Sequence, residues 1–340
     1  MQTAKLDSNK PVTTNGHSKP HPEPDHATRL FNGQFQVGVG LYDGVSALLA
    51  AKHHFDFVWV SSFCCSAAAG LPDVGIIGPE DILNLVHLSR RLVDLPIIVD
   101  LDSGYGDPVK VFHVIEAMAR AGVSAVCIED NPTSKRCSLY GGYDRALASI
   151  DEHVARLRAA RIAIKEARSN CRIIARTEAL VAGMGMAEAL KRATAYADNG
   201  ADAVFAQSLD ATGNEILTFG RKWGRRTPYI IAPTKLPKIT KKEFAEAGVS
   251  HTIFANQGLR AAHKAIDLTF RTLAEATSAQ SVEPDISTVA EVATLVGAQE
   301  VVELETLLAN APVTPVSTKS LVKSSRKLAA NGQARRASKR

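Results

Sequence analysis

Acidic side chains gather at the ends of three short apolar runs in this sequence. Asp100 and Asp102 end one run, Glu129 and Asp130 end the next, and Asp73 follows an earlier one. Alternation along an extended strand would place Asp100 and Asp102 on the same side, where two carboxylates repel each other unless a cation relieves them. Oxygen ligands with bound water suit Mg²⁺ or Mn²⁺ better than zinc. The pattern predicts a magnesium site, and a helix cap with a solvated turn is the alternative for the Asp100–Asp102 pair alone.

Arg176 also follows an apolar run, in the segment Ala175-Arg176-Thr177-Glu178. Beside a metal, an arginine can hold a carboxylate or a phosphoryl group through two parallel hydrogen bonds. A structural salt bridge, for example with Glu178, is the alternative. Taken with the acidic side chains, Arg176 favours a small anionic substrate.

A polar segment between residues 131 and 142 contains glycine and is long for a connection between a strand and a helix. Loops of this kind often act as lids. Within it, Cys137 follows two cations, Lys135 and Arg136, which could lower the pKa of the thiol and let it act as an acid or base. An inert surface cysteine is the alternative interpretation.

These side chains need a scaffold that brings successive strand ends together, and one pattern recurs between residues 35 and 260. Short β-branched runs alternate with helical stretches, and a glycine separates helix from strand at Gly122, Gly200 and Gly248. The runs are continuously hydrophobic, which is typical of parallel strands buried on both faces. Eight strands are predicted: Gln36–Val39, Phe55–Val60, Pro96–Leu101, Ala125–Glu129, Arg172–Arg176, Ala203–Gln207, Tyr229–Ala232 and His251–Ala255. The predicted helices include Pro108–Arg120, Ile150–Ala167 and Met186–Asp198.

Eight successive β/α units favour an α/β fold of the closed (β/α)₈ TIM-barrel type, in which functional groups collect at the C-terminal ends of the strands. An open doubly wound sheet is the alternative, although no Gly-x-Gly-x-x-Gly motif follows the first strand. We predict a disordered tail over residues 1–27, the barrel with further C-terminal helices over residues 28–309, and a basic disordered tail over residues 310–340.

The bulk composition of the chain agrees with one large globular domain. Of its 340 residues, 45% are hydrophobic and 22% are charged, and the longest apolar stretches are only strand-sized, so no membrane span is predicted. The N-terminus lacks the apolar run of a secretory signal. The five cysteines do not have the spacing of a zinc site, which indicates free thiols, and a cytoplasmic location is predicted. The net charge of +5 arises from eight basic residues after position 318, which leaves the rest of the chain mildly acidic. Such a tail is usually solvated, and nucleic acid is the less favoured partner.

A family resemblance emerges from the motif Asp100-Leu101-Asp102-Ser103-Gly104-Tyr105-Gly106, which Glu129-Asp130 follows about two dozen residues later. Together with Leu41-Tyr42-Asp43-Gly44-Val45-Ser46-Ala47 and Gly70-Leu71-Pro72-Asp73, it resembles the isocitrate lyase/phosphoenolpyruvate mutase superfamily, from about Phe31 to Glu305. The resemblance implies a (β/α)₈ barrel whose C-terminal helix swaps between subunits, hence a homodimer or homotetramer. It also implies Mg²⁺ and a small-molecule 2-oxo acid or phosphonate as substrate.

The resemblance also implies roles for individual residues. Asp100 matches the direct metal ligand, and three further carboxylates match groups that act through water: Asp102, Glu129 and the outer-sphere Asp73. The segment Ser61-Ser62-Phe63 matches the one that binds the 2-oxo carboxylate, partly through backbone N–H groups, and Arg176 matches the substrate-binding arginine. In every branch, the metal stabilises the oxyanion of a pyruvate enolate.

The motifs of this chain do not all indicate the same branch of the superfamily. Lyases carry Lys-Lys/Arg-Cys-Gly-His with the cysteine as proton donor, and this chain has Lys135-Arg136-Cys137 followed by Ser138-Leu139. Mutases carry Lys-x-Asn-Ser, so Lys135 and Ser138 match while Cys137 replaces the asparagine that contacts the phosphoryl group. Gln207-Ser208 aligns with a mutase His-Ser, and the segments Pro233-Thr234-Lys235 and Ala255–Ala261 also resemble the mutase branch.

The sequence therefore favours a phosphoenolpyruvate mutase-type isomerase of phosphonate metabolism. Lys135, Arg176 and Ser138 would hold the phosphoryl group, with Gln207 among the substrate-binding residues. A carbon–carbon lyase with Cys137 as general acid and a phosphonopyruvate hydrolase are the alternatives. A barrel that has lost catalysis and serves as a binding protein is a fourth possibility, against which the clustered carboxylates argue, because a scaffold has no use for them.

Overall fold

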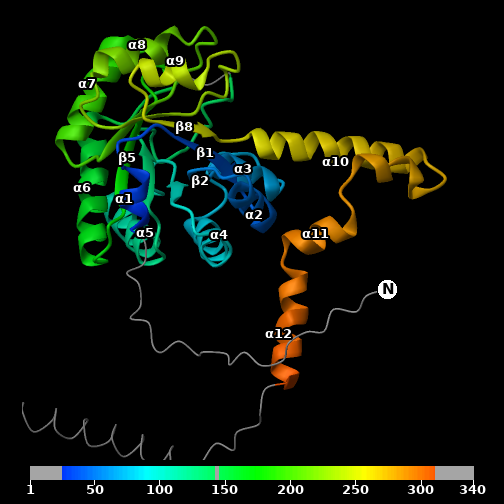
Figure 1. Cartoon of the computed structure of the whole chain (residues 1–340). Helices are drawn as coiled ribbons and strands as arrows, with labels where there is room; N and C mark the ends of the chain where they lie inside the picture. The colour runs from blue at the N-terminus through cyan, green and yellow to red at the C-terminus, as the bar shows by residue number, and fades with distance from the viewer. Residues whose placement is uncertain (1–24, 142–144, 311–340) are drawn as a thin grey trace, which may run out of the picture. The chain divides into compact units, whose positions relative to one another are not determined.

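Eight parallel strands close into a barrel in the computed structural model, which describes residues 25–141 and 145–310 (Figure 1). Each strand pairs with the next along the chain, and β8 returns to β1, so that Gln36 lies opposite His251. The strands are β1 Gln36–Leu41, β2 Phe57–Val60, β3 Ile97–Asp100, β4 Ala125–Glu129, β5 Arg172–Thr177, β6 Ala203–Ala206, β7 Tyr229–Ile231 and β8 His251–Phe254. The predicted (β/α)₈ fold is confirmed, and the open sheet is excluded.

Burial of both strand faces explains why the runs are continuously apolar. Alternate residues such as Phe57 and Trp59 of β2 belong to a cluster that fills the barrel interior, whereas Val58 and Val60 pack outward against the helices. Gly38 of β1 leaves room for this interior packing, because a Cβ at that position would come within 2.2 Å of the Phe57 ring. The barrel is thus a packed core, and its free space for a ligand is at the rim.

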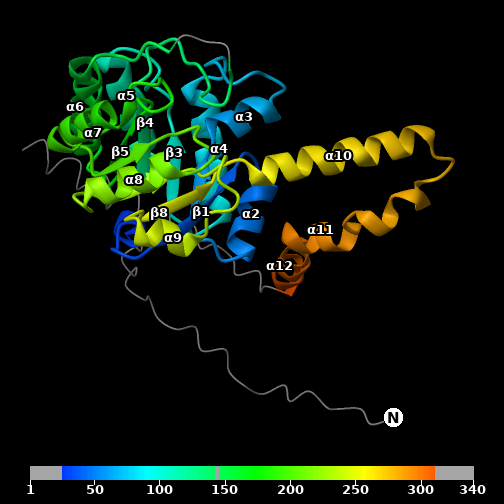
Figure 2. The ribbon, with the colours of Figure 1, turned by 90° about the horizontal axis from the view of Figure 1, so that it is seen from above.

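Helices form the outer layer between successive strands, as the two views show (Figures 1 and 2). Around the barrel they are α1 His26–Leu30, α2 Gly44–Lys52, α3 Ser62–Ala68, α4 Pro79–Leu92, α5 Pro108–Arg120, α6 Ile150–Glu166, α7 Gly185–Asp198, α8 Asn214–Trp223 and α9 Lys241–Glu246. Local signals fix several of their starts: Asp107 caps α5 ahead of Pro108, and Ser149 with Glu152 forms a capping box on α6. These starts were already visible in the sequence.

Helix α10, Gln257–Glu275, leaves β8 and projects away from the barrel (Figure 2). None of its residues is buried, although one side carries Ile266, Phe270 and Leu273. Two short 3₁₀ helices, Ala279–Ser281 and Glu283–Asp285, complete the first compact unit of the chain. Helices α11 Val289–Leu295 and α12 Ala298–Asn310 belong to a second unit that begins at Ile286.

The ends of the described chain bear on the predicted tails. Asp25 caps α1, so the predicted boundary between residues 27 and 28 falls inside a helix. Residues 1–24 and 311–340, which include the predicted basic tail, lie outside the described residues. The helices expected before residue 309 correspond to α11 and α12. Within the described ranges, no helix combines the length and the apolar character needed to cross a membrane.

Candidate active site

A pocket lies at the C-terminal ends of the strands, where the functional groups of barrel enzymes collect. Every strand from β2 to β8 contributes to it, directly or through the residues that follow the strand. Its lining comprises Trp59, Ser61, Ser62, Phe63, Asp73, Asp100, Glu129, Lys135, Cys137, Ser138, Leu139, Arg176, Phe205, Gln207, Ala232, Thr234, Ala255 and Asn256. Of the acidic and other residues predicted for the site, Asp102 and Asp130 are outside this lining, and Asp102 contacts the pocket residue Lys135.

The ammonium of Lys135 lies at the centre of the acidic cluster. It donates hydrogen bonds to Ser62 Oγ at 2.7 Å, to Asp73 Oδ1 at 2.5 Å and to the carboxylate of Asp102. The Ser62 hydroxyl in turn donates to Asp100 Oδ2 at 3.1 Å. Burial alone would lower the pKa of Lys135, but the surrounding carboxylates outweigh it and raise the pKa well above its ordinary value. Lys135 is therefore a fixed cation whose three donors are all used.

The approach of Asp100 and Asp102 has a different origin from the one predicted. Asp100 ends β3, but Asp102 has a φ of +52°, in the left-handed region, so strand alternation does not continue past Asp100. The tight turn that this φ produces, and not a shared strand face, brings the second carboxylate beside Lys135. Burial raises the pKa of Asp102 to about 6, with Lys135 opposing the shift and Asp100 adding to it.

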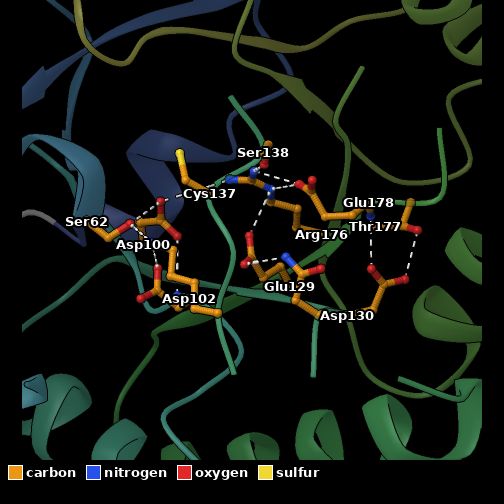
Figure 3. A network of polar contacts seen from close by, with 12 residues as sticks. Ser62, Asp100, Asp102, Glu129, Asp130, Cys137, Ser138, Arg176, Thr177 and Glu178 are labelled. Atoms are coloured by element: carbon orange, nitrogen blue, oxygen red, sulfur yellow. Dashed lines mark hydrogen bonds and ion pairs between the residues drawn. The ribbon is translucent and has the colours of Figure 1, made fainter. Parts of the chain in front are cut away.

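Arg176, at the end of β5, lies between the acidic cluster and the loop that follows β4 (Figure 3). Its guanidinium pairs with Glu178 Oε1 at 2.6 Å and Glu129 Oε2 at 3.4 Å, and Asp100 Oδ2 is 4.0 Å away. It also donates to Ser138 Oγ at 2.7 Å and covers the ring of Phe205. The predicted anion-binding arginine thus faces the pocket and makes the salt bridge with Glu178 as well. A substrate anion would have to compete with these partners.

Glu129 and Asp130 point to opposite sides of β4, as neighbours in a strand must. Glu129 lines the pocket and accepts from Asn131 Nδ2 at 2.8 Å, and burial raises its pKa to about 8. Asp130 instead accepts from Thr177 Oγ1 and the Glu178 backbone N–H (Figure 3). It also accepts from Tyr196 Oη, and it is not among the residues that line the pocket. The expectation that both carboxylates face the barrel mouth is wrong for Asp130, which holds β5 and α7 in place.

The thiol of Cys137 is buried in the pocket wall, so it is not a surface cysteine. Burial, followed by the negative charge of Asp73, raises its pKa to about 12. The predicted lowering of this pKa by Lys135 and Arg136 is wrong, because desolvation of the thiolate outweighs the neighbouring cations. Cys137 is a neutral, proton-bearing group in this structure.

The carboxylates around the pocket exceed the cations that neutralise them. Lys135 pairs with Asp73 and Asp102, and Arg176 pairs with Asp100, Glu129 and Glu178, so five buried acids share two basic groups. This oxygen-only, negatively charged donor set suits a hard divalent cation. Within the described ranges, however, no three acidic, histidine or cysteine side chains are arranged to hold a metal ion, and the ammonium of Lys135 lies among the carboxylates. The residue types fit Mg²⁺, and its binding would require Lys135 to give way.

Three pocket residues on the far wall had no predicted role: Phe205, Thr234 and Asn256. Phe205 lies inside β6 and was predicted only as strand core. Thr234 and Asn256 belong to segments that resemble the mutase branch, but no role was predicted for either residue. Each follows the C-terminal end of a strand, β7 or β8, where functional groups are expected in a barrel. Applying the same positional rule to β7 and β8 would have found them.

The fold and the site define a (β/α)₈ barrel enzyme class with a carboxylate-rich rim pocket. Within that class the chain belongs to the phosphoenolpyruvate phosphomutase family, whose model matches residues 31–274. A phosphoenolpyruvate phosphomutase from Tetrahymena pyriformis is 34% identical over 259 residues, which cover 76% of this chain and 86% of the relative. A phosphonopyruvate hydrolase from Variovorax sp. is 32% identical over 79% of this chain and 92% of its own. A 2-methylisocitrate lyase from Bacillus subtilis is 34% identical over 69% of this chain and 76% of its own length.

Solved structures that resemble this chain come from the same group of enzymes. A phosphoenolpyruvate phosphomutase from Streptomyces platensis subsp. rosaceus superposes with a TM-score of 0.80 at 33% identity, covering 84% of this chain and 99% of that one. A phosphonopyruvate hydrolase in complex with oxalate and Mg²⁺ gives a TM-score of 0.75 at 28% identity, covering 84% and 97%. The superfamily predicted from sequence is confirmed, and the relatives include an isomerase, a hydrolase and a lyase at similar identity.

Proposed function

We propose that this chain is a cytosolic, Mg²⁺-dependent phosphoenolpyruvate mutase-type enzyme that interconverts phosphoenolpyruvate and phosphonopyruvate. The observation that carries the proposal is the pairing of Arg176 with the Ser138 hydroxyl at 2.7 Å, on the loop side of the pocket. A guanidinium and a hydroxyl together can hold the oxygens of a phosphoryl group as it moves between oxygen and carbon. Gln207, where lyases usually have a glutamate, supports the same branch.

The metal would be held by Asp100, with Asp102 and Glu129 as supporting carboxylates that act through water. A bound Mg²⁺ supplies stabilisation of the negative charge on the oxygen of a pyruvate enolate. Asp73 completes the acidic wall and holds Lys135 by its ammonium group. The excess of carboxylates over cations in this cluster supports this assignment.

The remaining pocket residues would bind and shield the substrate. Backbone N–H groups of the segment Ser61-Ser62-Phe63, which follows β2, together with the hydroxyls of its two serines, would bind the carboxylate of the 2-oxo acid. Lys135 and Arg176 would exchange part of their contacts with protein carboxylates for the phosphoryl oxygens. Trp59 and Leu139 line the pocket with apolar surface, which helps to exclude water from the enolate and so to prevent hydrolysis or protonation.

The direct test is incubation of the purified chain with phosphonopyruvate and Mg²⁺, followed by ³¹P NMR. The proposal predicts that the phosphonate resonance is replaced by that of phosphoenolpyruvate, and that Asp100→Asn and excess EDTA each abolish the change. Free phosphate with pyruvate would identify a hydrolase instead. An unchanged spectrum at high enzyme concentration would refute both activities.

A carbon–carbon lyase is the second candidate, favoured by one specific observation. Cys137 lines the pocket, is buried, and has a pKa of about 12, so its thiol carries the proton that a general acid would deliver to an enolate. The loop differs from the lyase pattern after Cys137, where Ser138 and Leu139 replace Gly-His. Substrates of this alternative would be substituted malates or related 2-hydroxy acids.

We also propose that the enzyme is a homodimer or a homotetramer in which α10 packs against a partner subunit. The helix has no buried residue, yet Ile266, Phe270 and Leu273 are spaced to form one apolar side. Phe270 is 68% exposed, which is costly for an aromatic side chain flanked by other apolar groups. A helix exchanged between copies would cover this side.

A further inference from the structure

The guanidinium of Arg145 binds several main-chain carbonyls of the loop that follows β4. It donates to Cys137 O and Tyr140 O, each at 2.8 Å, and more weakly to Ser138 O at 3.3 Å and Arg136 O at 3.4 Å. Cys137 O also accepts from the Tyr140 N–H at 3.1 Å, which closes a tight turn over residues 136–140. Within the described part of the chain, every hydrogen bond of the Arg145 side chain goes to a carbonyl of this 136–140 turn.

A guanidinium suits this position better than any other side chain. Carbonyl oxygens that approach one point carry like partial charges and repel one another, so the turn needs a donor group among them. A guanidinium offers five N–H donors in a rigid planar fork, whereas the ammonium of a lysine offers three donors on a compact head. The conformation of the 136–140 turn therefore depends on Arg145, and a lysine at this position would replace it only in part.

The same segment forms one wall of the pocket. Four of its side chains line the pocket: Lys135, Cys137, Ser138 and Leu139. Arg145 is not among the lining residues, so it acts on the pocket only through the main chain of the turn. The Tyr140 hydroxyl accepts from the Asp73 backbone N–H at 3.3 Å, which ties the turn to the acidic wall as well. A displaced turn would therefore move the groups assigned to the phosphoryl group and uncover the thiol of Cys137, which is only 5% exposed.

We propose that Arg145 is a positioning residue, which holds the 136–140 turn in the conformation that presents Lys135, Cys137 and Ser138 to the substrate. The inference rests on the proposed function where it links the turn to phosphoryl transfer. The positioning itself can be measured without any substrate, because the turn also buries the Cys137 thiol. A displacement of about 1 Å in a group that holds the substrate can cost on the order of 100-fold in rate.

Alkylation of Cys137 tests the positioning apart from catalysis. Wild type, Arg145→Ala and Arg145→Lys would be treated with iodoacetamide, and each modified cysteine would be identified by peptide mass spectrometry. Arg145→Ala should raise the rate at Cys137 at least tenfold, since one hydrogen bond from a charged donor is worth roughly 10- to 100-fold. Guanidinium chloride, far below denaturing concentrations, should restore the protection by replacing the missing group, and sodium chloride should not. Arg145→Lys should give an intermediate rate, and Cys171, a buried cysteine directly before β5, should stay protected throughout.

Kinetics provide the second readout. In Arg145→Ala, kcat for phosphonopyruvate should fall roughly 10- to 100-fold and recover with guanidinium chloride, because the substrate-holding groups return to their positions. Arg158→Ala is the matched control, since this exposed arginine of α6 donates to Asn199 Oδ1 and should change neither readout.

The two readouts distinguish the possible failures. The inference is overturned if Cys137 stays protected in Arg145→Ala, if Cys137 and Cys171 become reactive together, or if guanidinium chloride restores nothing. Should Arg145→Ala fail to fold, Arg145→Lys carries the same comparison. Exposure of Cys137 that guanidinium chloride reverses, in a protein that converts no phosphonopyruvate, would refute the proposed function and leave the positioning role standing.

Discussion

The ammonium of Lys135 lies 2.5 Å from Asp73 Oδ1, and both side chains are almost completely buried. The same ammonium also contacts Asp102, so one cation links a residue that follows α3 to the turn after β3. An ion pair taken out of water is stable only when each charge keeps its partner. Lys135 therefore does for the acidic cluster what a metal ion would also do.

The first prediction tests whether Mg²⁺ can take the place of the Lys135 ammonium in the acidic cluster. Lys135→Met removes the ammonium but keeps the volume, leaving Asp73 and Asp102 without a counter-charge. In EDTA, the variant should melt roughly 5–15 °C below wild type, since breaking a buried pair costs about 3–5 kcal/mol. Added Mg²⁺ should raise the melting temperature of the variant more than that of wild type, because the dication replaces the missing charge.

Differential scanning fluorimetry over a Mg²⁺ series measures both effects. Lys110→Met, at an exposed position on α5, is the matched control and should leave the melting temperature and its Mg²⁺ response unchanged. Equal Mg²⁺ shifts in Lys135→Met and wild type would contradict the idea that the metal and the lysine compete for the same carboxylates.

The second prediction separates the mutase from the lyase. Cys137→Ser keeps a small polar group in the pocket wall but replaces the protonated thiol. A lyase that uses the thiol as general acid should lose roughly 10²–10⁴-fold in kcat, whereas a mutase transfers no proton and should lose less than tenfold. The measurement is kcat on phosphonopyruvate and on a panel of substituted malates. Cys171→Ser, at a buried cysteine directly before β5, controls for loss of a thiol elsewhere.

The scaffold was largely readable from the sequence, and the contacts within the site were not. Strand β4, Ala125–Glu129, has the predicted bounds, because a fully buried parallel strand leaves a continuous apolar run between polar ends. The positions of Asp100, Glu129 and Arg176 follow from that rule. Lys135 belongs to an irregular loop, so nothing local indicates that its ammonium would reach Asp73, 62 residues earlier.

Protonation states were the other limit of sequence reasoning. The cations next to Cys137 in sequence suggested a low thiol pKa, but burial is a property of the folded chain and decides the sign of the shift. Asp130 is a different case, since strand alternation already places it opposite Glu129. Its hydrogen bonds to Thr177 and Tyr196 agree with that rule, which the sequence interpretation did not apply.

The third prediction concerns assembly through α10. Phe270→Asp places a charge in the centre of the exposed apolar side and should convert the oligomer to a smaller species, as measured by sedimentation velocity or light scattering. Lys264→Asp, on the opposite side of the same helix, introduces an aspartate of equal size and should leave the oligomer intact. A wild-type chain that sediments as a monomer, or a Phe270→Asp variant that keeps the wild-type mass, would contradict the proposed role of α10.

The fourth prediction concerns stability at acid pH and depends on His153 of α6. Its ring is fully buried, lies edge-on to Tyr196 at 4.5 Å, and within the described ranges neither ring nitrogen has a hydrogen-bond partner. Burial, with the nearby charges of Arg156 and Arg192, lowers the pKa of His153 from 6.5 to about 3. Above pH 6.5, the ring is neutral in both the folded and the unfolded chain, so its titration does not affect stability. Between pH 6.5 and about 3, only the unfolded chain takes up the proton, so the free energy of unfolding falls as the pH falls.

Replacing this histidine should therefore flatten the pH dependence of stability. For His153→Phe, the free energy of unfolding should decline less steeply below pH 6.5 than in wild type, by about 1.4 kcal/mol per pH unit for the one proton removed. Urea unfolding at pH 7, 6 and 5 measures the slope, and it reports the slope even if the larger ring changes the absolute stability. His87→Phe, at an exposed position on α4, should leave the slope at its wild-type value. Parallel curves for His153→Phe and wild type would mean that the buried ring takes up its proton in the folded chain as readily as in the unfolded one.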